Sequence, residues 1–115
     1  MSNEQKASVL QGTLDLMVLL TLATLGPMHG YAISARIEQV SKGAIQLKMG
    51  TLYPGLLRLA QRGLISAQWD RTETHRRARY YSITAAGRRQ LKTEKMEWAR
   101  MTAIMEALAL EGDAG

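Results

Sequence analysis

Cysteine and phenylalanine are both absent from the 115 residues of this chain. Without thiols, disulfide bonds, thiolate catalysis and cysteine-ligated metal sites are excluded. Aromatic residues make up only 5% of the sequence, so a hydrophobic core must be built from leucine, isoleucine, valine, methionine and alanine. A reducing, cytoplasmic location fits this composition.

The chain also lacks an apolar segment long enough to cross a bilayer. Its longest apolar region, residues 14–25, contains Asp15, Thr21 and Thr24, whereas a membrane-spanning helix needs about 20 mostly apolar residues. The first six residues do not show the basic-then-apolar order of a signal peptide. We therefore expect a cytoplasmic protein with no membrane partner.

Motifs of enzymes and metal sites are missing as well. The sequence has no phosphate-binding loop of the Gly-Lys-Ser/Thr kind and no glycine-rich dinucleotide fingerprint. Its two histidines, His29 and His75, have no further ligands at the spacing of a metal site. His29 is expected to cap a helix or to pack. We expect no enzyme activity, no cofactor and no metal.

Acidic residues are in the minority, which leaves a formal net charge of +5. A basic chain favours a polyanionic partner, most simply nucleic acid or an anionic membrane surface. Hydrophobic residues make up 46% of the sequence, which is enough to form a core. The length suits one small domain.

Hydrophobic periodicity predicts three helices, two strands and a long final helix, after a polar, frayed start at residues 1–8. The predicted helices span residues 13–25, 29–40 and 50–62, the strands span 64–69 and 79–83, and the last helix runs to about residue 110. Gly63 is expected to end the third helix and Thr84 to cap the fourth. This order is typical of a winged helix-turn-helix followed by a dimerisation helix.

The expected fold class is therefore mainly α with a small two-stranded β wing. Residues 1–84 would form a winged helix-turn-helix DNA-binding domain, 85–111 a C-terminal dimerisation helix, and 112–115 a loose tail. In the second helix, Tyr31, Ile33, Ile37 and Val40 are expected to face inward.

The third helix has an apolar face formed by Leu52, Leu56 and Leu59 and widened by Leu57. Its other face carries groups that can donate hydrogen bonds to phosphates and base edges. The residues expected to contact DNA from this helix and its start are Lys48, Thr51, Tyr53, Pro54 and Arg58. Considered alone, the helix fits an ordinary surface helix equally well, and Tyr53 could instead pack against the second helix.

The segment between the two strands is rich in arginine. On the first strand, Ile65, Ala67 and Trp69 alternate with polar residues, as in a half-buried strand. The residues expected to contact phosphates or a minor groove from this wing are Arg71, Arg76, Arg77 and Arg79. The alternative is a solvated tip that protects the sheet edge from aggregation.

The final helix carries a narrow apolar seam with coiled-coil-like spacings of seven, three, four and three residues. Such a seam has little to pack on in so small a domain, which predicts a homodimer. The residues expected at the dimer interface are Leu14, from the largely apolar first helix, and Leu91, Trp98, Met101, Met105 and Leu108. Trp98 could also be plain interface core, since large aromatics dominate interfaces generally.

Four segments together resemble the PadR-like transcriptional regulators, in particular the short type with one C-terminal helix. They are Gly12 to Leu16, Gly26 to Tyr31, Gly50 to Pro54 with the leucines that follow and Gly63 to Ile65, and Arg79 to Gly87. The likeness covers roughly residues 10–110. It implies a homodimeric winged-helix repressor that binds a two-fold-related operator and responds to a small, often aromatic molecule.

By this resemblance, Tyr53 faces DNA and the basic wing tip corresponds to Arg76, Arg77 and Arg79. Trp98 matches a tryptophan that holds flat ligands at the dimer interface of some members, and Met101 would share that effector site. The wing departs from the pattern, because Asp70 and Glu73 would oppose a phosphate if they faced it.

The sequence thus predicts a sequence-specific DNA-binding regulator, a homodimeric repressor on a pseudo-palindromic operator, released by a small aromatic effector. The alternative is a winged-helix dimerisation module that binds a protein partner without specific DNA recognition, because a fold alone does not decide function.

Overall fold

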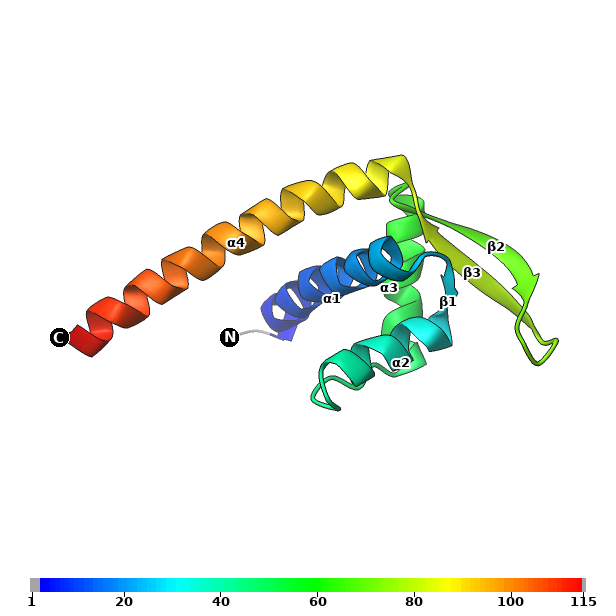
Figure 1. The fold of residues 1–115 in the computed structure, drawn as a ribbon, viewed down its shortest axis with the longest axis horizontal. Helices are drawn as coiled ribbons and strands as arrows, with labels where there is room; N and C mark the ends of the chain where they lie inside the picture. The colour runs from blue at the N-terminus through cyan, green and yellow to red at the C-terminus, as the bar shows by residue number, and fades with distance from the viewer. Residues whose placement is uncertain (1–2, 115) are drawn as a thin grey trace.

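The computed structural model describes residues 3–114, which form four helices and three short strands (Figure 1). In chain order, the elements are α1 (Asn3–Leu25), β1 (Met28–His29), α2 (Gly30–Val40), α3 (Met49–Gln61), β2 (Ile65–Arg71), β3 (Arg77–Ile83) and α4 (Ala85–Ala114). The mainly helical fold with a β wing and a long last helix is the predicted class. Residues 3–8 are helical, so the prediction of a frayed start is wrong there, while residues 1–2 lie outside the described part.

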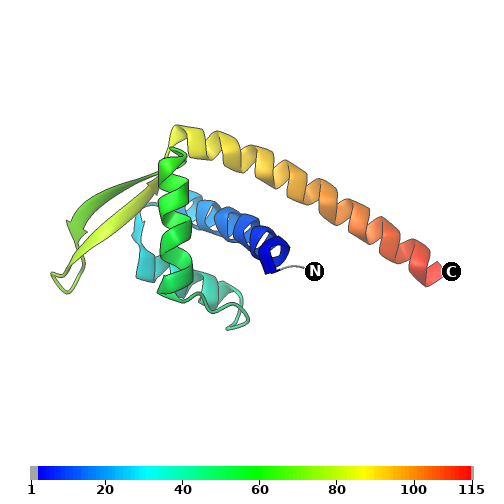
Figure 2. The same cartoon turned by 180° about the vertical axis from the view of Figure 1, so that it is seen from behind.

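The core lies where α1 and α3 meet, with α2 on one side and the sheet at one end (Figures 1 and 2). On α1, Val18 and Leu22 have no exposed surface. On α3, the predicted inner residues Leu52, Leu56 and Leu59 are also fully buried. Aliphatic side chains therefore supply nearly all of the core, as the lack of phenylalanine requires.

The inner face of α2 is narrower than its sequence predicts. Ile33 and Ile37 are buried, but Tyr31 is 71% exposed and Val40 is 64% exposed. Tyr31 lies in the first turn of α2, on the side of the wing, and Val40 is the last helical residue before the chain turns away. The connector that follows is not a strand. It is fastened to α2 by the Ser34 hydroxyl, which donates to the Leu47 carbonyl oxygen over 2.7 Å.

The sheet has three antiparallel strands in the order β1-β3-β2, one more than predicted. The additional strand, β1, is only two residues long and pairs Met28 with Tyr81 and His29 with Tyr80. A two-residue strand shows no periodicity of its own, because it depends on a partner far along the chain.

The wing hairpin of β2 and β3 is longer than predicted, since Asp70 pairs with Ala78 and Arg71 with Arg77. Hydrogen bonds between Thr72 and Arg76 close its tip. The Thr72 N–H donates to the Arg76 carbonyl oxygen over 2.8 Å, and the Arg76 N–H donates to the Thr72 hydroxyl over 3.2 Å. With this closure, the strands run out to Arg71 and Arg77, and residues 72–76 form the tip.

Thr84 ties together the end of α3, the wing and the start of α4. Its hydroxyl donates to the Gly63 carbonyl oxygen over 2.7 Å and accepts the Gly87 N–H over 3.0 Å. Its own N–H donates to the Leu64 carbonyl oxygen over 3.1 Å. Gly63 has a φ of 73°, in the left-handed region that suits a glycine after a helix. Both sequence predictions, the Gly63 stop and the Thr84 cap, are confirmed.

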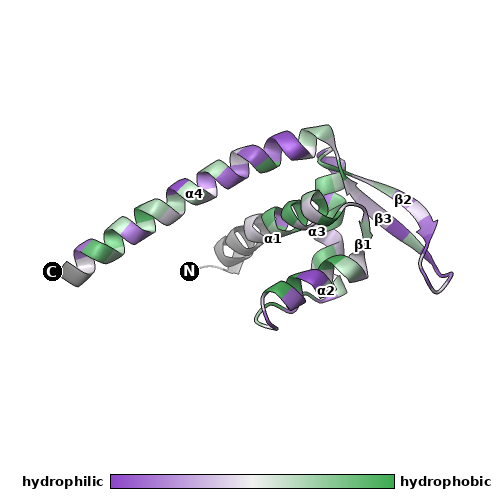
Figure 3. Ribbon diagram, in the orientation of Figure 1, coloured by the Kyte–Doolittle hydropathy of each residue, from purple (hydrophilic) through white to green (hydrophobic). Residues whose placement is uncertain are grey.

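Helix α4 packs on the core only near its start and then projects from the body (Figure 1). Leu91 is buried at 7% exposure, whereas the apolar residues from Met96 onward are exposed. The projection makes the protomer elongated. Its radius of gyration is 16.3 Å, whereas a compact domain of this length would have about 13 Å. Green stretches along the projecting part mark uncovered apolar residues (Figure 3).

The Thr84 junction predicts a strict requirement for glycine at position 87. A methyl group there would lie on the Leu64 carbonyl oxygen and 2.7 Å from the Cγ1 atom of Ile83. Because the oxygen belongs to the backbone and cannot move aside easily, we expect Gly87→Ala to lower the free energy of unfolding by about 3 kcal/mol. Urea unfolding followed by circular dichroism measures the change.

Gly112→Ala is the matched control, because Gly112 lies in the same helix with no neighbouring atom within 4 Å of the added methyl. There alanine should raise helix stability, by up to about 1 kcal/mol. Wild-type stability of Gly87→Ala would contradict the close packing at the junction.

Candidate nucleic-acid interface

The outer face of α3 presents Thr51, Tyr53 and Pro54 to solvent, as predicted, and Lys48 is exposed just before the helix. The helix begins at Met49, so Tyr53 and Pro54 lie in its second turn. Leu57, expected to widen the apolar face, is instead 56% exposed. It follows Tyr53 by four residues, which places the two side chains on one side of the helix.

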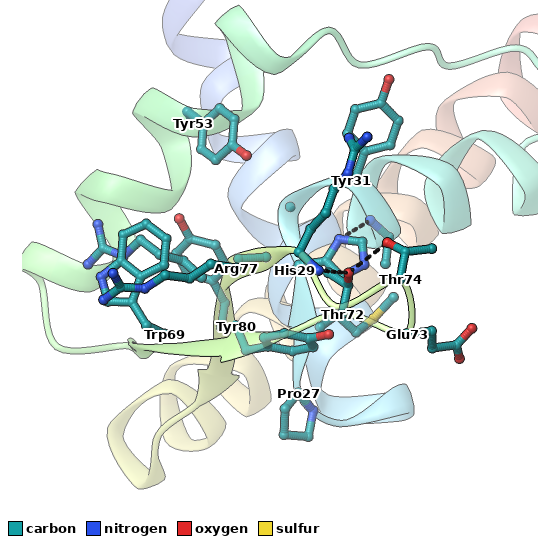
Figure 4. Close-up of a pocket in the computed structure, with 17 residues that line it drawn as sticks. Pro27, His29, Tyr31, Tyr53, Trp69, Thr72, Glu73, Thr74, Arg77 and Tyr80 are labelled. Carbon is teal, nitrogen blue, oxygen red and sulfur yellow. Dashed lines mark hydrogen bonds between the residues drawn. The ribbon is translucent and has the colours of Figure 1, made fainter.

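Tyr53 both packs against α2 and remains accessible. A Cβ added to Gly30 would lie 3.3 Å from the Cε1 atom of Tyr53 and 3.4 Å from its hydroxyl oxygen. The tyrosine is nevertheless 47% exposed. The two readings of Tyr53 are therefore compatible, because one edge of the ring rests on the first turn of α2 and the rest faces a groove (Figure 4).

Arg58 is held by an acidic residue of α1. Its Nη2 atom lies 3.5 Å from Oδ1 of Asp15, and Arg62 Nη1 lies 3.9 Å from the other carboxylate oxygen. Burial raises the pKa of Asp15 above its ordinary value of 3.8, and the two arginines only partly oppose that effect. The sequence expectation of a DNA contact took no account of this partner.

Period-two alternation brings arginines and a tryptophan together on one face of the wing. On β2 this face carries Ile65, Ala67, Trp69 and Arg71, which are opposite Ile83, Tyr81, Arg79 and Arg77 of β3. Near the helices the face is buried, at Ile65 and Tyr81. Farther out, Trp69 is 58% exposed, so the expectation of a half-buried position is wrong, because the hairpin extends beyond the helices that could cover it.

Asp70 lies on the opposite face of β2 from Trp69, because successive side chains of a strand alternate. Its side chain therefore leaves the strand on the other face from those of Arg77 and Arg79, although Asp70 and Arg77 both border a smaller cavity near the tip. Glu73 is in the tip and borders the groove, together with Arg76. The acidic residues that depart from the family pattern are thus divided between two sides of the wing.

A groove of about 1000 Å³ separates the wing from α2 and α3. Aromatic and basic side chains dominate its walls (Figure 4). They include Tyr31, Tyr53, Trp69, Tyr80, Arg76, Arg77 and Arg79. Tyr31 and Trp69 were not expected to be accessible. One sequence feature could have indicated their exposure. Each residue lies at an end of an apolar pattern, beyond the helices that cover the rest of it.

His29 caps α2, as expected. Its Nδ1 atom accepts the Ala32 N–H over 3.2 Å, and its ring meets that of Tyr80 edge-on at 5.5 Å. Within the described part of the chain, no three His, Asp or Glu side chains gather as metal ligands would. None of the helices there has both the length and the apolarity to span a bilayer.

The residues expected at a dimer interface fall into two groups. Leu14 and Leu91 are buried inside the protomer, at 5% and 7% exposure, so they have little surface left for a partner. The others lie uncovered on α4, with exposures between 51% and 60%: Trp98, Met101, Met105 and Leu108.

Comparison with known proteins agrees with this architecture. Residues 18–93 match the profile of the "Transcriptional regulator PadR-like family". The chain belongs to this family. A transcriptional regulator from Clostridium thermocellum is 30% identical to this chain, with a TM-score of 0.76. The match covers 86% of this chain and 95% of that protein's chain. A PadR family transcription regulator from Clostridium difficile is 27% identical, with coverages of 83% and 96% and a TM-score of 0.70.

A PadR-like transcription factor from Bacteroides fragilis, 23% identical, shares the fold over 92% of this chain and 99% of its own, with a TM-score of 0.78. An uncharacterised 37.1 kDa protein from a transposon of Streptomyces fradiae is 41% identical over 88 residues. Those residues are 76% of this chain and 24% of that protein, so the chain spans about a quarter of its length.

In this PadR-like regulator, the raised pKa of Asp15 predicts a pH-dependent stability. The folded state binds the proton more tightly than the unfolded state, so the wild type gains stability relative to Asp15→Asn below pH 3.8 and loses it as the pH rises through the folded pKa. Urea unfolding of both proteins at several pH values measures the difference between their free energies of unfolding. The contributions of the other titrating groups cancel in this difference. A difference that grows with pH would show that the Arg58 and Arg62 pairs outweigh burial.

Proposed function

We propose that this PadR-like regulator is a homodimeric repressor that binds a pseudo-palindromic DNA operator through α3 and the wing. The observation that carries the proposal is the groove of about 1000 Å³ between them, whose walls combine tyrosine, tryptophan and arginine side chains. Repression would follow because a dimer seated on a promoter blocks access to it.

In this proposal α3 enters the major groove. Tyr53 is accessible and held in place by its contact with the first turn of α2, so its hydroxyl can meet a phosphate. Thr51, Pro54 and Lys48 share the accessible start of the helix. Arg58 contributes less, since it would have to leave Asp15, or reach DNA while remaining paired.

The wing would contact the neighbouring phosphate backbone. All four wing arginines are exposed: Arg71, Arg76, Arg77 and Arg79. The last three of them border the groove. Each arginine that neutralises a phosphate releases condensed counterions, which makes the affinity dependent on salt.

Dimerisation would use the seam of α4. Four large apolar side chains on one side of a projecting helix are uncovered in the protomer. Burying such side chains against a second copy removes them from water, at roughly 25 cal/mol for each Å². A two-fold dimer would place two α3 helices about 34 Å apart, one turn of DNA.

The DNA-binding proposal predicts the behaviour of the Arg76→Ala, Arg77→Ala double variant. A fragment from the protein's own promoter region is titrated at several salt concentrations, with a scrambled fragment of equal length as reference. The wild type should prefer the promoter fragment. The double variant should bind more weakly, and its log-log salt slope should be smaller by about two units, one per lost phosphate contact.

Gln68→Ala is the control, because Gln68 is exposed on the opposite face of the same hairpin. It should bind like the wild type, and the dimer should persist in all three proteins. A wild type that shows no preference for the promoter fragment would defeat specific recognition and favour a winged-helix module that binds a protein partner.

The dimer proposal predicts that Met105→Glu produces monomers. A carboxylate buried in the seam without a partner costs about 3 kcal/mol or more, which weakens association at least about 100-fold. Sedimentation velocity measures the mass. In a Trp69→Phe background Trp98 is the remaining tryptophan, and its emission should shift to longer wavelength in the monomer. Arg100→Ala, an exposed change on the same helix, is the control, and a dimeric Met105→Glu would refute this interface.

The same Trp98 reporter tests effector release, the remaining part of the proposal. Trp98 and Met101 are accessible in the protomer and would border any cavity formed between two copies of the seam. A planar aromatic compound bound there should quench Trp98 emission saturably and weaken operator binding. Quenching that never saturates across a panel of such compounds would count against this site.

A further inference from the structure

Trp69 occupies an unusual position for a large apolar side chain. It lies near the outer end of the wing with 58% of its surface exposed, beyond the helices that bury Ile65 on the same face. A tryptophan with most of its surface in water gains little from burial in the core. The interactions that hold the Trp69 ring in position are therefore its contacts on the wing.

Those contacts are with two arginines of β3. The guanidinium carbon of Arg77 lies 4.8 Å from the centre of the Trp69 ring, and that of Arg79 lies 5.8 Å from it. Both distances are within the range of cation–π attraction, for which tryptophan is the best aromatic partner. Figure 4 shows Trp69 and Arg77 side by side on the wing, below the Tyr53 side chain.

The register of the hairpin produces this arrangement. Trp69 and Arg79 are direct cross-strand partners, and Arg77 is diagonal to Trp69 on the same face, two pairs closer to the tip. Within the described residues neither arginine takes part in an ion pair, and Asp70 is on the other face. The tryptophan is therefore the neighbour that orders both guanidinium groups without neutralising their charge.

We propose that Trp69 is a positioning residue of the DNA interface, whose ring holds Arg77 and Arg79 ready to contact phosphates. The proposal rests on the DNA-binding function proposed above and adds to it a residue that carries no charge of its own. It follows from the exposure of the tryptophan, its two guanidinium contacts and its place on the groove wall.

The physical gain is a smaller entropy loss on binding. A free arginine side chain loses much of its rotamer freedom when it is fixed on a phosphate, and a side chain that is already ordered loses less. An acidic residue could also order an arginine, but it would cancel the charge that attracts DNA. An aromatic ring orders the guanidinium and leaves its charge and its N–H donors available.

A double-mutant cycle tests the proposal with the same promoter fragment. Trp69→Leu keeps an apolar side chain but removes the aromatic face. We expect it to weaken binding about 3- to 10-fold, which corresponds to the entropy cost of fixing about one additional arginine side chain on binding. Its log-log salt slope should stay at the wild-type value, because the arginines still reach the phosphates. The Arg77→Ala, Arg79→Ala variant should instead lose about two units of slope.

The decisive comparison places Trp69→Leu in the Arg77→Ala, Arg79→Ala background. Because the tryptophan acts through these arginines, the substitution should cause no further loss of affinity there. Trp69→Phe should restore most of the affinity lost in Trp69→Leu, and Gln68→Ala should bind like the wild type. Thermal unfolding of each variant establishes that the wing domain is folded.

The outcomes separate this proposal from the function on which it rests. If the wild type binds and the arginine variant does not, but Trp69→Leu binds like the wild type, the DNA function stands and the positioning role is overturned. Equal losses in both backgrounds would also overturn it, because Trp69 would then act independently of the arginines. A wild type that binds no DNA would overturn both proposals.

Discussion

The hydroxyl of Thr84 is the contact on which the relative placement of the functional elements depends. It joins the end of α3 to the first turn of α4, through the Gly63 carbonyl oxygen and the Gly87 N–H. The backbone N–H of the same residue donates to the carbonyl oxygen of Leu64, the residue just before β2. One residue thus links the proposed recognition helix, the wing and the projecting helix. The absence of a side chain at Gly87 is part of this arrangement, because any Cβ would collide with the Leu64 carbonyl.

On the wing, the same period-two alternation runs from the buried core out to the solvent-exposed tip. The face that begins with Ile65 inside the core continues outward to Trp69 and then to Arg71 without a change of alternation. The helices cover only the inner part of this face, and the outer part borders the groove. An apolar inner end anchors the hairpin by burial, while its outer end carries exposed arginines. The wing is therefore stabilised at a distance from the surface that would contact DNA.

Patterns local to the sequence predicted the helices, the Gly63 stop, the His29 and Thr84 caps and the inner leucines of α3, because each depends on neighbours within one or two turns. Contacts between distant segments were not predictable in this way. Strand β1 exists only through β3, and the Arg58 pair requires Asp15, which lies 43 residues earlier. The assignment of Leu14 and Leu91 to a partner's surface ignored burial within the protomer. Periodicity shows which side of a helix is apolar, but not whether the same chain or a second copy covers it.

The few aromatic residues of this chain lie mostly outside its hydrophobic core. The chain has two tryptophans and four tyrosines, and only Tyr81 belongs to the buried core. Tyr31, Tyr53, Trp69 and Tyr80 line the groove beside the wing, and Trp98 lies on the uncovered seam of α4. Aliphatic side chains are sufficient to fill a small core, whereas aromatic rings offer large, rigid contact surfaces at interfaces. Residue types are therefore divided between stability and binding. Leucine, isoleucine and valine stabilise the fold, and the few aromatic residues lie where a partner would bind.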